Sequence, residues 1–216
     1  MDTNSALPIL NSIELRVLGA LIEKSKTTPD YYPMTLNAIT IACNQKTSRK
    51  PVVEYDEETV VIALNSLKNQ SLVSTAVGGS SRTIKYKHNF TTVYPLTDGE
   101  LAILCLLFLR GAQTPGELNT NSARLHEFKT IESVNEVLSK LINTQPPFII
   151  ELPKRAGQKE TRFIHLLGES INYEEDELQE EPARKHVSDL EMRLTLLENE
   201  LQEVKATLDK ITKELF

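Results

Sequence analysis

The stretch LNSIEL at residues 10–15 determines how the fold is interpreted, because LTDGEL at residues 96–101 repeats its pattern 86 positions later. In each stretch, a residue that can cap a helix precedes a glutamate by three positions, which is the pattern of a capping box. Leucines flank each box at the spacing of a hydrophobic staple, so each stretch predicts the start of a helix. The capping pairs are Asn11 with Glu14 and Thr97 with Glu100.

The similarity between the two stretches continues along the chain at the same offset. Leu15, Leu18 and Leu21 align with Leu101, Leu104 and Leu107, Lys24 aligns with Arg110, and Thr28-Pro29 aligns with Thr114-Pro115. The first copy then contains four extra residues, after which Leu36-Asn37 aligns with Leu118-Asn119. Duplication of one unit is the economical explanation for this pattern.

Each copy predicts three helices followed by two strands, which is the order of a winged helix. Apolar residues recur at helical spacing, and Gly-containing polar loops separate the strands. In the first copy, the predicted helices cover 12–25, 34–44 and 56–69, and the strands cover 72–77 and 83–88. In the second copy, the helices cover 98–111, 115–125 and 130–143, and the strands cover 148–152 and 161–166. The predicted fold is α+β, mainly α with small β wings, with two tandem winged-helix (helix-turn-helix) domains.

The expected domain boundaries follow from the repeat and from a change in charge. Residues 1–95 form the first winged-helix domain, with a net formal charge of +2, and residues 96–168 form the second, with no net charge. An acidic linker at 169–182 and a coiled-coil helix at 183–216 together carry −8. The acidity of the chain lies in its C-terminal part, so it does not exclude nucleic-acid binding by the two domains.

The C-terminal segment carries apolar residues at strict 3,4 spacing, which predicts a coiled coil. Heptad pairing would place Arg193 opposite the partner's Glu198, an arrangement that favours a parallel pair. We therefore expect a parallel homodimer, and the alternative is a single helix that folds back on its own domains. The predicted dimer contacts are Val187, Leu190, Leu194, Leu197, Leu201, Val204, Leu208, Ile211 and Leu215.

Three further stretches are distinctive: TTPDYYP at 27–33, ACNQKT at 42–47 and LRGAQTPGEL at 109–118. They resemble the signatures of the YceH-like family of uncharacterised bacterial proteins, and the resemblance covers roughly residues 11–168. The resemblance implies a tandem winged-helix fold followed by a heptad-bearing helix. It implies no activity, because the family has no established function to carry onto these residues.

The sequence favours a protein that stays in the cytoplasm. Residues 1–10 lack the basic start and apolar core of a signal peptide. The longest apolar run, 101–109, is far shorter than the roughly 20 residues of a membrane-spanning helix. Cys43 and Cys105 lie in helical stretches and have no Cys or His at ligand spacing. We therefore expect buried free thiols and neither a disulfide nor a metal site.

No group of residues in the sequence indicates catalysis. The chain lacks a phosphate-binding glycine loop and a dinucleotide fingerprint, so we expect a non-enzymatic protein without a cofactor. His88 and His165 fall on corresponding strands of the two copies, which favours a surface role on the wings. The insertion at 30–33 (Asp-Tyr-Tyr-Pro) is expected to be a structural loop anchored by tyrosine packing. The alternative for this insertion is a pocket or a partner contact.

Two classes of partner remain open, double-stranded DNA and protein. The third helix of the first copy opens with three acids at 56–58, which oppose phosphate binding, although acids also complement a helix dipole. Basic residues in the loops and wings could bind phosphates, and the alternative is that they only make these loops soluble. The candidate nucleic-acid-binding residues are Lys46, Arg49, Lys50, Arg82, Lys85, Lys87, Lys154, Arg155, Lys159 and Arg162.

The balance narrowly favours a dimeric DNA-associated protein, such as a transcriptional regulator, over a protein-interaction or scaffold module. The argument for DNA rests on the usual behaviour of winged helices and on the basic loops. If it holds, Arg49→Glu combined with Lys50→Glu is expected to abolish DNA retention while leaving the fold and the dimer intact.

Overall fold

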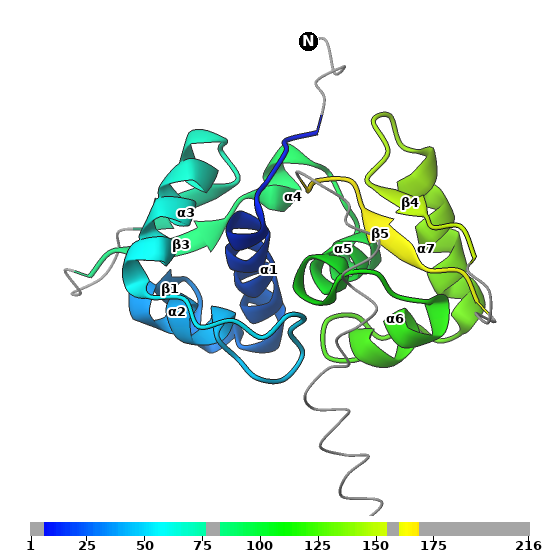
Figure 1. Ribbon diagram of the computed structural model, residues 1–216, viewed down its shortest axis with the longest axis horizontal. Helices are drawn as coiled ribbons and strands as arrows, with labels where there is room; N and C mark the ends of the chain where they lie inside the picture. The colour runs from blue at the N-terminus through cyan, green and yellow to red at the C-terminus, as the bar shows by residue number, and fades with distance from the viewer. Residues whose placement is uncertain (1–6, 77–82, 155–159, 169–216) are drawn as a thin grey trace, which may run out of the picture. The chain divides into compact units, whose positions relative to one another are not determined.

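The computed structural model describes residues 7–76, 83–154 and 160–168, which form an α+β fold of helices with small antiparallel sheets. Figure 1 shows two sets of helices side by side. The residues before 96 are called here the first half, and residues 96–168 the second half. Both halves belong to one compact unit. In each half, helices are followed by antiparallel strands, an order compatible with a winged-helix-like fold.

The first half contains a three-stranded antiparallel sheet. Strand β3 lies between β1 and β2, and Tyr86 at its centre pairs with Met34 on one side and Thr75 on the other. The elements are α1 (Ser12–Thr27), a 3₁₀ turn (Pro29–Tyr31), β1 (Met34–Thr35), α2 (Leu36–Cys43), α3 (Glu57–Asn69), β2 (Val73–Ala76), β3 (Lys85–His88) and α4 (Phe90–Val93).

The second half repeats this plan with fewer elements. Its two strands form an antiparallel hairpin in which Ile150 pairs with Ile164. An isolated antiparallel bridge joins Gln113 to Phe163 and takes the place that β1 occupies in the first half. The elements are α5 (Asp98–Arg110), α6 (Pro115–Ser122), α7 (Ile131–Asn143), β4 (Ile149–Glu151) and β5 (Phe163–His165).

Both capping boxes predicted from the repeat are present. The side chain of Asn11 accepts a hydrogen bond from the backbone N–H of Glu14 at 2.9 Å, and Glu14 Oε2 accepts one from the backbone N–H of Asn11 at 2.8 Å. Thr97 and Glu100 make the equivalent pair at the start of α5. Because these bonds satisfy backbone N–H groups that no helical turn can reach, they fix where each helix begins.

The two halves meet where α1 packs against α5. Residues 101–109 of α5 are all buried, as expected of a helix that is apolar all round. At the crossing, the thiol of Cys105 donates to the backbone oxygen of Gly19 at 3.4 Å. These residues stand 86 positions apart, the offset of the repeat, so equivalent positions of the two copies contact each other. The halves therefore share one hydrophobic core.

Gly19 lies at the closest approach of these two helices. A Cβ at this position would lie 2.9 Å from Leu109 Cγ and 3.2 Å from Phe108 Cβ. We expect Gly19→Ala to lower the free energy of unfolding by about 1–3 kcal/mol, the usual cost of overpacking a core. Urea unfolding followed by circular dichroism measures this change.

Gly116→Ala in α6 is the matched control, because a Cβ there meets its nearest neighbour at 3.8 Å, an ordinary contact. This control should leave stability unchanged or raise it by up to about 1 kcal/mol, since alanine is the better helix former. Equal unfolding midpoints for the two variants would contradict the close approach of α1 and α5.

The start of the first half also pairs with the end of the second. The backbone N–H of Leu10 donates to the oxygen of Leu167 at 2.7 Å, and Leu10 forms a parallel bridge with Gly168. The backbone N–H of Lys50 donates to the oxygen of Leu109 at 2.8 Å. The connection between the halves is therefore made by backbone hydrogen bonds as well as by the α1–α5 contact.

The predicted elements agree with those of the structure to within a few residues at each end. The pattern missed β1, α4 and the 3₁₀ turn, which are each four residues or shorter. The predicted linker (169–182) and coiled coil (183–216), including all the dimer contacts, lie outside the described residues. Across the ranges that are described, none of the helices combines the length and apolar character of a membrane span.

Candidate functional site

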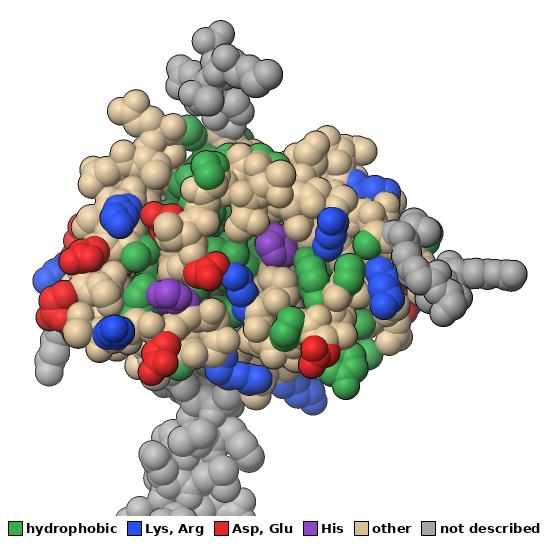
Figure 2. All heavy atoms as spheres, turned by 180° about the vertical axis from the view of Figure 1, so that it is seen from behind, with side chains coloured by type: hydrophobic (Ala, Val, Ile, Leu, Met, Phe, Trp, Pro, Cys, Tyr) green, Lys and Arg blue, Asp and Glu red, His purple; other side chains and the backbone are tan. Residues whose placement is uncertain are grey.

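The structure separates the candidate nucleic-acid-binding residues by their burial. Among those described, Lys46, Lys87 and Lys154 are exposed, whereas Lys50, Lys85 and Arg162 are half-buried and Arg49 is buried. Arg82, Arg155 and Lys159 lie outside the described residues. Figure 2 shows that acidic and basic side chains are interspersed on the face seen there, so that face presents no continuous basic surface.

The prediction that Arg49 contacts phosphate is wrong, because its side chain is 0% exposed. Its guanidinium forms a two-pronged ion pair with Glu23 of α1, at 2.6 Å and 3.0 Å. The remaining N–H groups donate to the backbone oxygens of Ala42 and Ser48 and to the side chain of Gln45. Every donor is satisfied inside the protein, so Arg49 ties the loop after α2 to α1.

The double substitution Arg49→Glu with Lys50→Glu therefore cannot leave the fold intact, as the sequence had suggested. It would bury a carboxylate beside Glu23 without a counter-charge, and a buried unpaired charge is strongly destabilising. A loss of DNA retention in that variant would report unfolding and not a lost phosphate contact.

Arg162 is also held by the protein. Its guanidinium donates to the backbone oxygen of Ala112 at 2.8 Å and pairs with Glu117 at 3.2 Å. Glu117 in turn closes a capping box with Thr114 at the start of α6. Arg162 thus links the second hairpin to α6, and its charge is already matched by a carboxylate.

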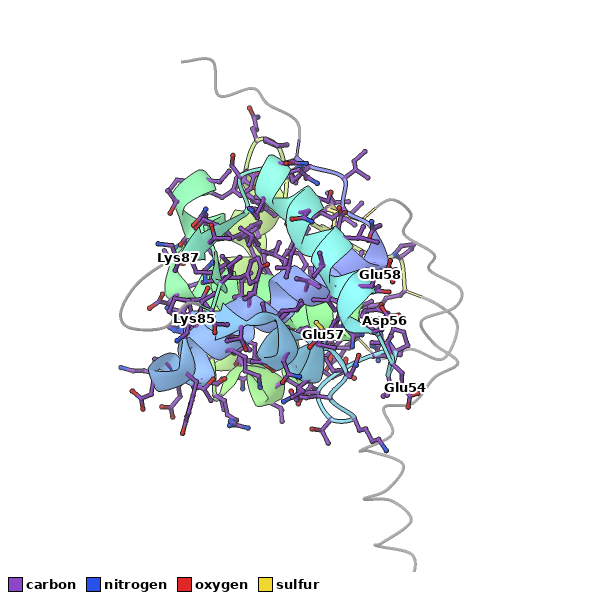
Figure 3. All side chains as sticks on the ribbon, turned by 90° about the vertical axis from the view of Figure 1, so that its left-hand side faces the viewer. Glu54, Asp56, Glu57, Glu58, Lys85 and Lys87 are labelled. Carbon is purple, nitrogen blue, oxygen red and sulfur yellow. The ribbon has the colours of Figure 1, made fainter. Side chains whose placement is uncertain are left out.

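The outward face of α3 carries carboxylates where a DNA-reading helix would carry donors. Asp56 caps the helix by accepting from the backbone N–H of Thr59 at 2.8 Å, and Glu57 and Glu58 follow it in exposed positions. Figure 3 shows the acids at this end of the helix, whereas Lys85 and Lys87 lie on the other side of the view. A phosphate backbone that ran from the strand lysines to the start of α3 would meet these carboxylates.

Helices α2 and α3 each expose a large apolar side chain. Ile62 on α3 is 64% exposed and Ile41 on α2 is 61% exposed. Ile62 lies one helical turn after Glu58, so on α3 an exposed apolar side chain is next to an exposed carboxylate.

Helix α7 matches α3 in charge. Glu132 and Glu136 are exposed on it, and its single basic residue, Lys140, comes in the last turn. Both third helices are therefore acidic over their first turns. This feature opposes phosphate binding in both halves and not only in the first.

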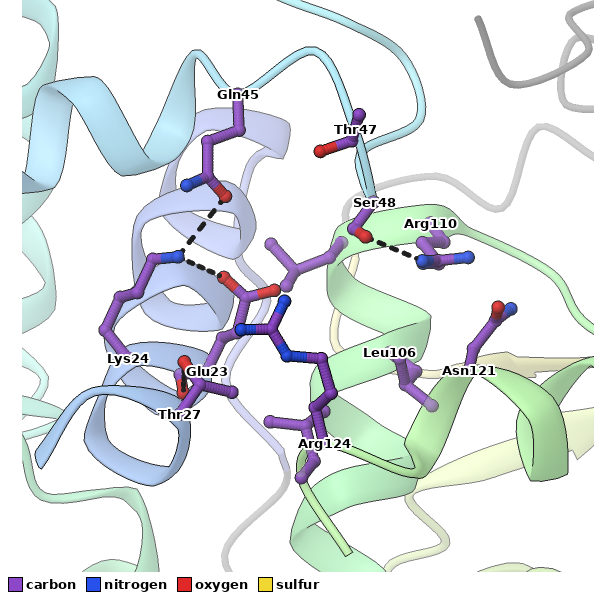
Figure 4. A pocket seen from close by; sticks show the side chains of 12 residues that line it. Glu23, Lys24, Thr27, Gln45, Thr47, Ser48, Leu106, Arg110, Asn121 and Arg124 are labelled. Atoms are coloured by element: carbon purple, nitrogen blue, oxygen red, sulfur yellow. Dashed lines mark hydrogen bonds and ion pairs between the residues drawn. The ribbon is translucent and has the colours of Figure 1, made fainter. Parts of the chain in front are cut away.

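A cavity of about 220 Å³ lies between the two halves (Figure 4). The first half lines it with α1 and the loop after α2, and the second half with α5 and the end of α6. This space is called here the cationic cavity. Its principal polar residues are Lys24, Gln45, Ser48, Arg110, Asn121 and Arg124.

Lys24 and Arg110 are the aligned basic residues of the repeat, and the packing of α1 on α5 brings both to the cationic cavity. Arg110 Nη2 donates to Ser48 Oγ at 2.8 Å, and Lys24 Nζ donates to Gln45 Oε1 at 3.3 Å. The repeat alignment and the distinctive stretches at 42–47 and 109–118 were the sequence signals for residues of this site. Arg124 and Asn121 had no such signal.

Glu23 supplies the carboxylate of the cationic cavity. Burial acts to raise its pKa, but the hydrogen bonds and charge of Arg49, with a further contribution from Lys24, hold the pKa below its ordinary value. Glu23 is therefore ionised and already paired. Its charge is matched by Arg49, so Lys24 and Arg124 have no second carboxylate among the described residues that line the cavity.

The histidines do not have the surface role that the sequence suggested. Burial lowers the pKa of His165 to about 4, and its ring packs edge-on against Phe108 at 5.0 Å between centroids. Burial, aided by the charge of Lys26, also lowers the pKa of His88 to about 4. Both are neutral, internally packed side chains at pH 7.

The cysteines and the tyrosine insertion follow the prediction. Cys43 and Cys105 are buried free thiols, and burial raises the pKa of Cys43 to about 12. Tyr32 anchors the insertion, because its Oη accepts from the backbone N–H of His88 at 2.6 Å. Tyr31 beside it is exposed. Within the described part of the chain, no group of His, Cys, Asp and Glu could hold a metal ion.

Comparison with known proteins gives relatives over most of the chain. The family described as "Protein of unknown function, DUF480" matches residues 10–158. A UPF0502 protein of Opitutus terrae is 45% identical over 82% of this chain and 77% of its own length. A UPF0502 protein of Shewanella baltica is 49% identical over 73% of this chain and 72% of its own length. One of Aliivibrio salmonicida is 41% identical over 95% of this chain and 96% of its own length.

Proposed function

We propose that this chain, which belongs to the DUF480 (UPF0502) family of uncharacterised bacterial proteins, functions as a protein-binding scaffold. The scaffold consists of two winged-helix units and is paired by the C-terminal heptads into a parallel homodimer in the cytoplasm. It has no catalytic step and no cofactor. Its partner is a protein segment that offers basic and apolar side chains.

The acidic third helices are the observation that carries this proposal. A winged helix reads DNA by placing its third helix in the major groove, where phosphates flank it on both sides. In α3 and α7, the exposed residues of the first turns include Glu57, Glu58, Glu132 and Glu136. Negative charge at these positions repels phosphates, whereas it attracts a basic partner segment.

The exposed isoleucines specify the partner further. Ile62 faces outward one turn after Glu58 on α3, so an acidic and an apolar contact lie next to each other on one helix face. A partner helix with a lysine or arginine beside an apolar residue would match both. Apolar contacts of this kind provide most of the affinity at protein interfaces, and the charges provide specificity.

Double-stranded DNA is the second candidate, and the exposed lysines favour it. Lys46, Lys87 and Lys154 project from loops and strands of both halves. They could contribute phosphate contacts without reading bases. With Arg49 buried and Arg162 already paired, the described part of the basic set is smaller than the sequence suggested.

A salt titration separates the two candidates. Fluorescence anisotropy of a labelled mixed-sequence duplex, titrated with the full chain at low and moderate salt, should show no salt-dependent binding. A protein that neutralises six phosphates would show a log–log slope of about −5. Tight binding with a slope of that size would reject the scaffold proposal in favour of DNA association.

The protein partner is tested by photo-crosslinking in cells that produce the full chain. A crosslinking amino acid in place of Ile62 should give a discrete adduct with a second protein, and adding Glu58→Lys should reduce that adduct at least several-fold. The matched control position is Thr92 on α4, which is exposed but does not belong to α3. Equal adducts from both positions, or no adduct from Ile62, would count against a contact on this face.

A further inference from the structure

We infer that the cationic cavity binds a small phosphate-bearing molecule and that this ligand contacts both halves of the protein. The inference is independent of which macromolecule binds to the outer faces of α3 and α7. It rests on the charge, the hydrogen-bond donors and the size of the cavity.

The charge of the cavity is positive beyond what its own carboxylate can balance. Lys24 and Arg124 line the cavity together with Glu23, which is the one carboxylate among its described lining residues. That carboxylate is bound by Arg49, which is itself wholly buried, and by Lys24 at 3.2 Å. The remaining positive charge would be neutralised by a dianion such as a phosphate monoester.

Arg124 is the cation with the least internal role. It follows the end of α6 and is exposed, and Figure 4 shows its guanidinium pointing into the cavity. Within the described ranges it makes no hydrogen bond or ion pair. A planar guanidinium that points into a cavity can donate two parallel hydrogen bonds to phosphate oxygens.

The other donors are held in place by the fold. Ser48 Oγ accepts from Arg110 Nη2 at 2.8 Å, which orients this guanidinium. The amide nitrogen of Asn121 donates to the side-chain oxygen of Gln113 at 2.8 Å, which orients the Asn121 side chain at the cavity. Groups fixed before the ligand arrives lose little conformational entropy on binding, so the contacts are more effective.

The size of the cavity limits what it can accept. Pockets for drug-sized ligands measure roughly 300–1,000 Å³. At about 220 Å³, the cationic cavity suits a smaller ligand. Most of its named polar groups are donors, and leucines form part of the wall. These features fit a phosphate group attached to a short carbon skeleton better than they fit an apolar ligand.

Binding at this position would link the halves more firmly. Lys24, Gln45 and Ser48 come from the first half, and Arg110, Asn121 and Arg124 come from the second. A ligand bonded to both sets stabilises the arrangement in which α1 packs against α5. Because a ligand that binds only the native state raises the free energy of unfolding, binding is visible as thermal stabilisation.

Inorganic phosphate is the probe for this site. Isothermal titration of the full-length protein, with chloride matching the ionic strength, should give saturable binding with a dissociation constant in the millimolar range or tighter. Arg124→Gln, which removes no internal bond, should weaken binding about tenfold, and adding Lys24→Gln should abolish it. Phosphate should raise the melting temperature of the wild type and not that of the double variant.

Lys140→Gln on α7 is the matched control, because it removes one exposed positive charge outside the cavity. It should bind phosphate like the wild type. Three outcomes would overturn the inference: no saturable binding by the wild type, equal weakening by Arg124→Gln and Lys140→Gln, or displacement of bound phosphate by a short DNA duplex. The last would assign the cations to a nucleic-acid surface.

Discussion

Arg49→Met is expected to lower the free energy of unfolding by about 3–5 kcal/mol, the cost of breaking a buried ion pair by removing one partner. The substitution leaves Glu23, on the inner side of α1, paired with Lys24 at 3.2 Å and without its buried partner. It also removes the donors that bond the backbone oxygens of Ala42 and Ser48. The midpoint of urea unfolding measures the loss.

Lys46→Ala is the matched control, because Lys46 is an exposed cation in the same loop. It should change stability by less than about 0.5 kcal/mol, as surface substitutions usually do. The double variant Glu23→Leu with Arg49→Met should recover part of the loss, because an apolar pair needs no counter-charge. Equal midpoints for Arg49→Met and Lys46→Ala would contradict the burial of the ion pair.

The stability of the protein is expected to fall steeply between pH 6.5 and pH 5 because of His88 and His165. Each has a pKa of about 4 in the folded protein and an ordinary value of 6.5. Below pH 6.5 the unfolded chain binds protons that the folded protein excludes. This contribution to stability is therefore present above pH 6.5 and is lost as the pH falls toward 4. Each histidine accounts for about 2 kcal/mol by pH 5.

Urea unfolding at pH 7.5 and pH 5 measures this loss. His165→Leu should remove about half of the pH dependence, because a neutral apolar side chain keeps the packing against Phe108 without binding a proton. Most carboxylates titrate below this window, so they contribute little to the slope. Equal stability of the wild type at the two pH values would show that neither histidine is protected from protonation.

The sequence determined the helices and their starting points. Capping boxes act through side chains within three residues of the backbone they bond, so Asn11 with Glu14 and Thr97 with Glu100 could be identified without a structure. Buried thiols at Cys43 and Cys105 were predictable from another local pattern, because each lies on a helix with apolar residues at helical spacing. The alignment of Lys24 with Arg110 could be identified from the sequence as well. Their common position at the cavity could not.

Only the tertiary structure decided which charged residues are available for binding. Glu23 and Arg49 are 26 residues apart, and no local pattern distinguishes a basic loop residue that pairs internally from one that faces solvent. The packing of α1 against α5 is a long-range contact that produces two features. It brings Gly19 against Cys105, and it forms the cationic cavity. Spacing along the chain sets local hydrogen bonds, whereas burial and charge pairing depend on which distant surfaces meet.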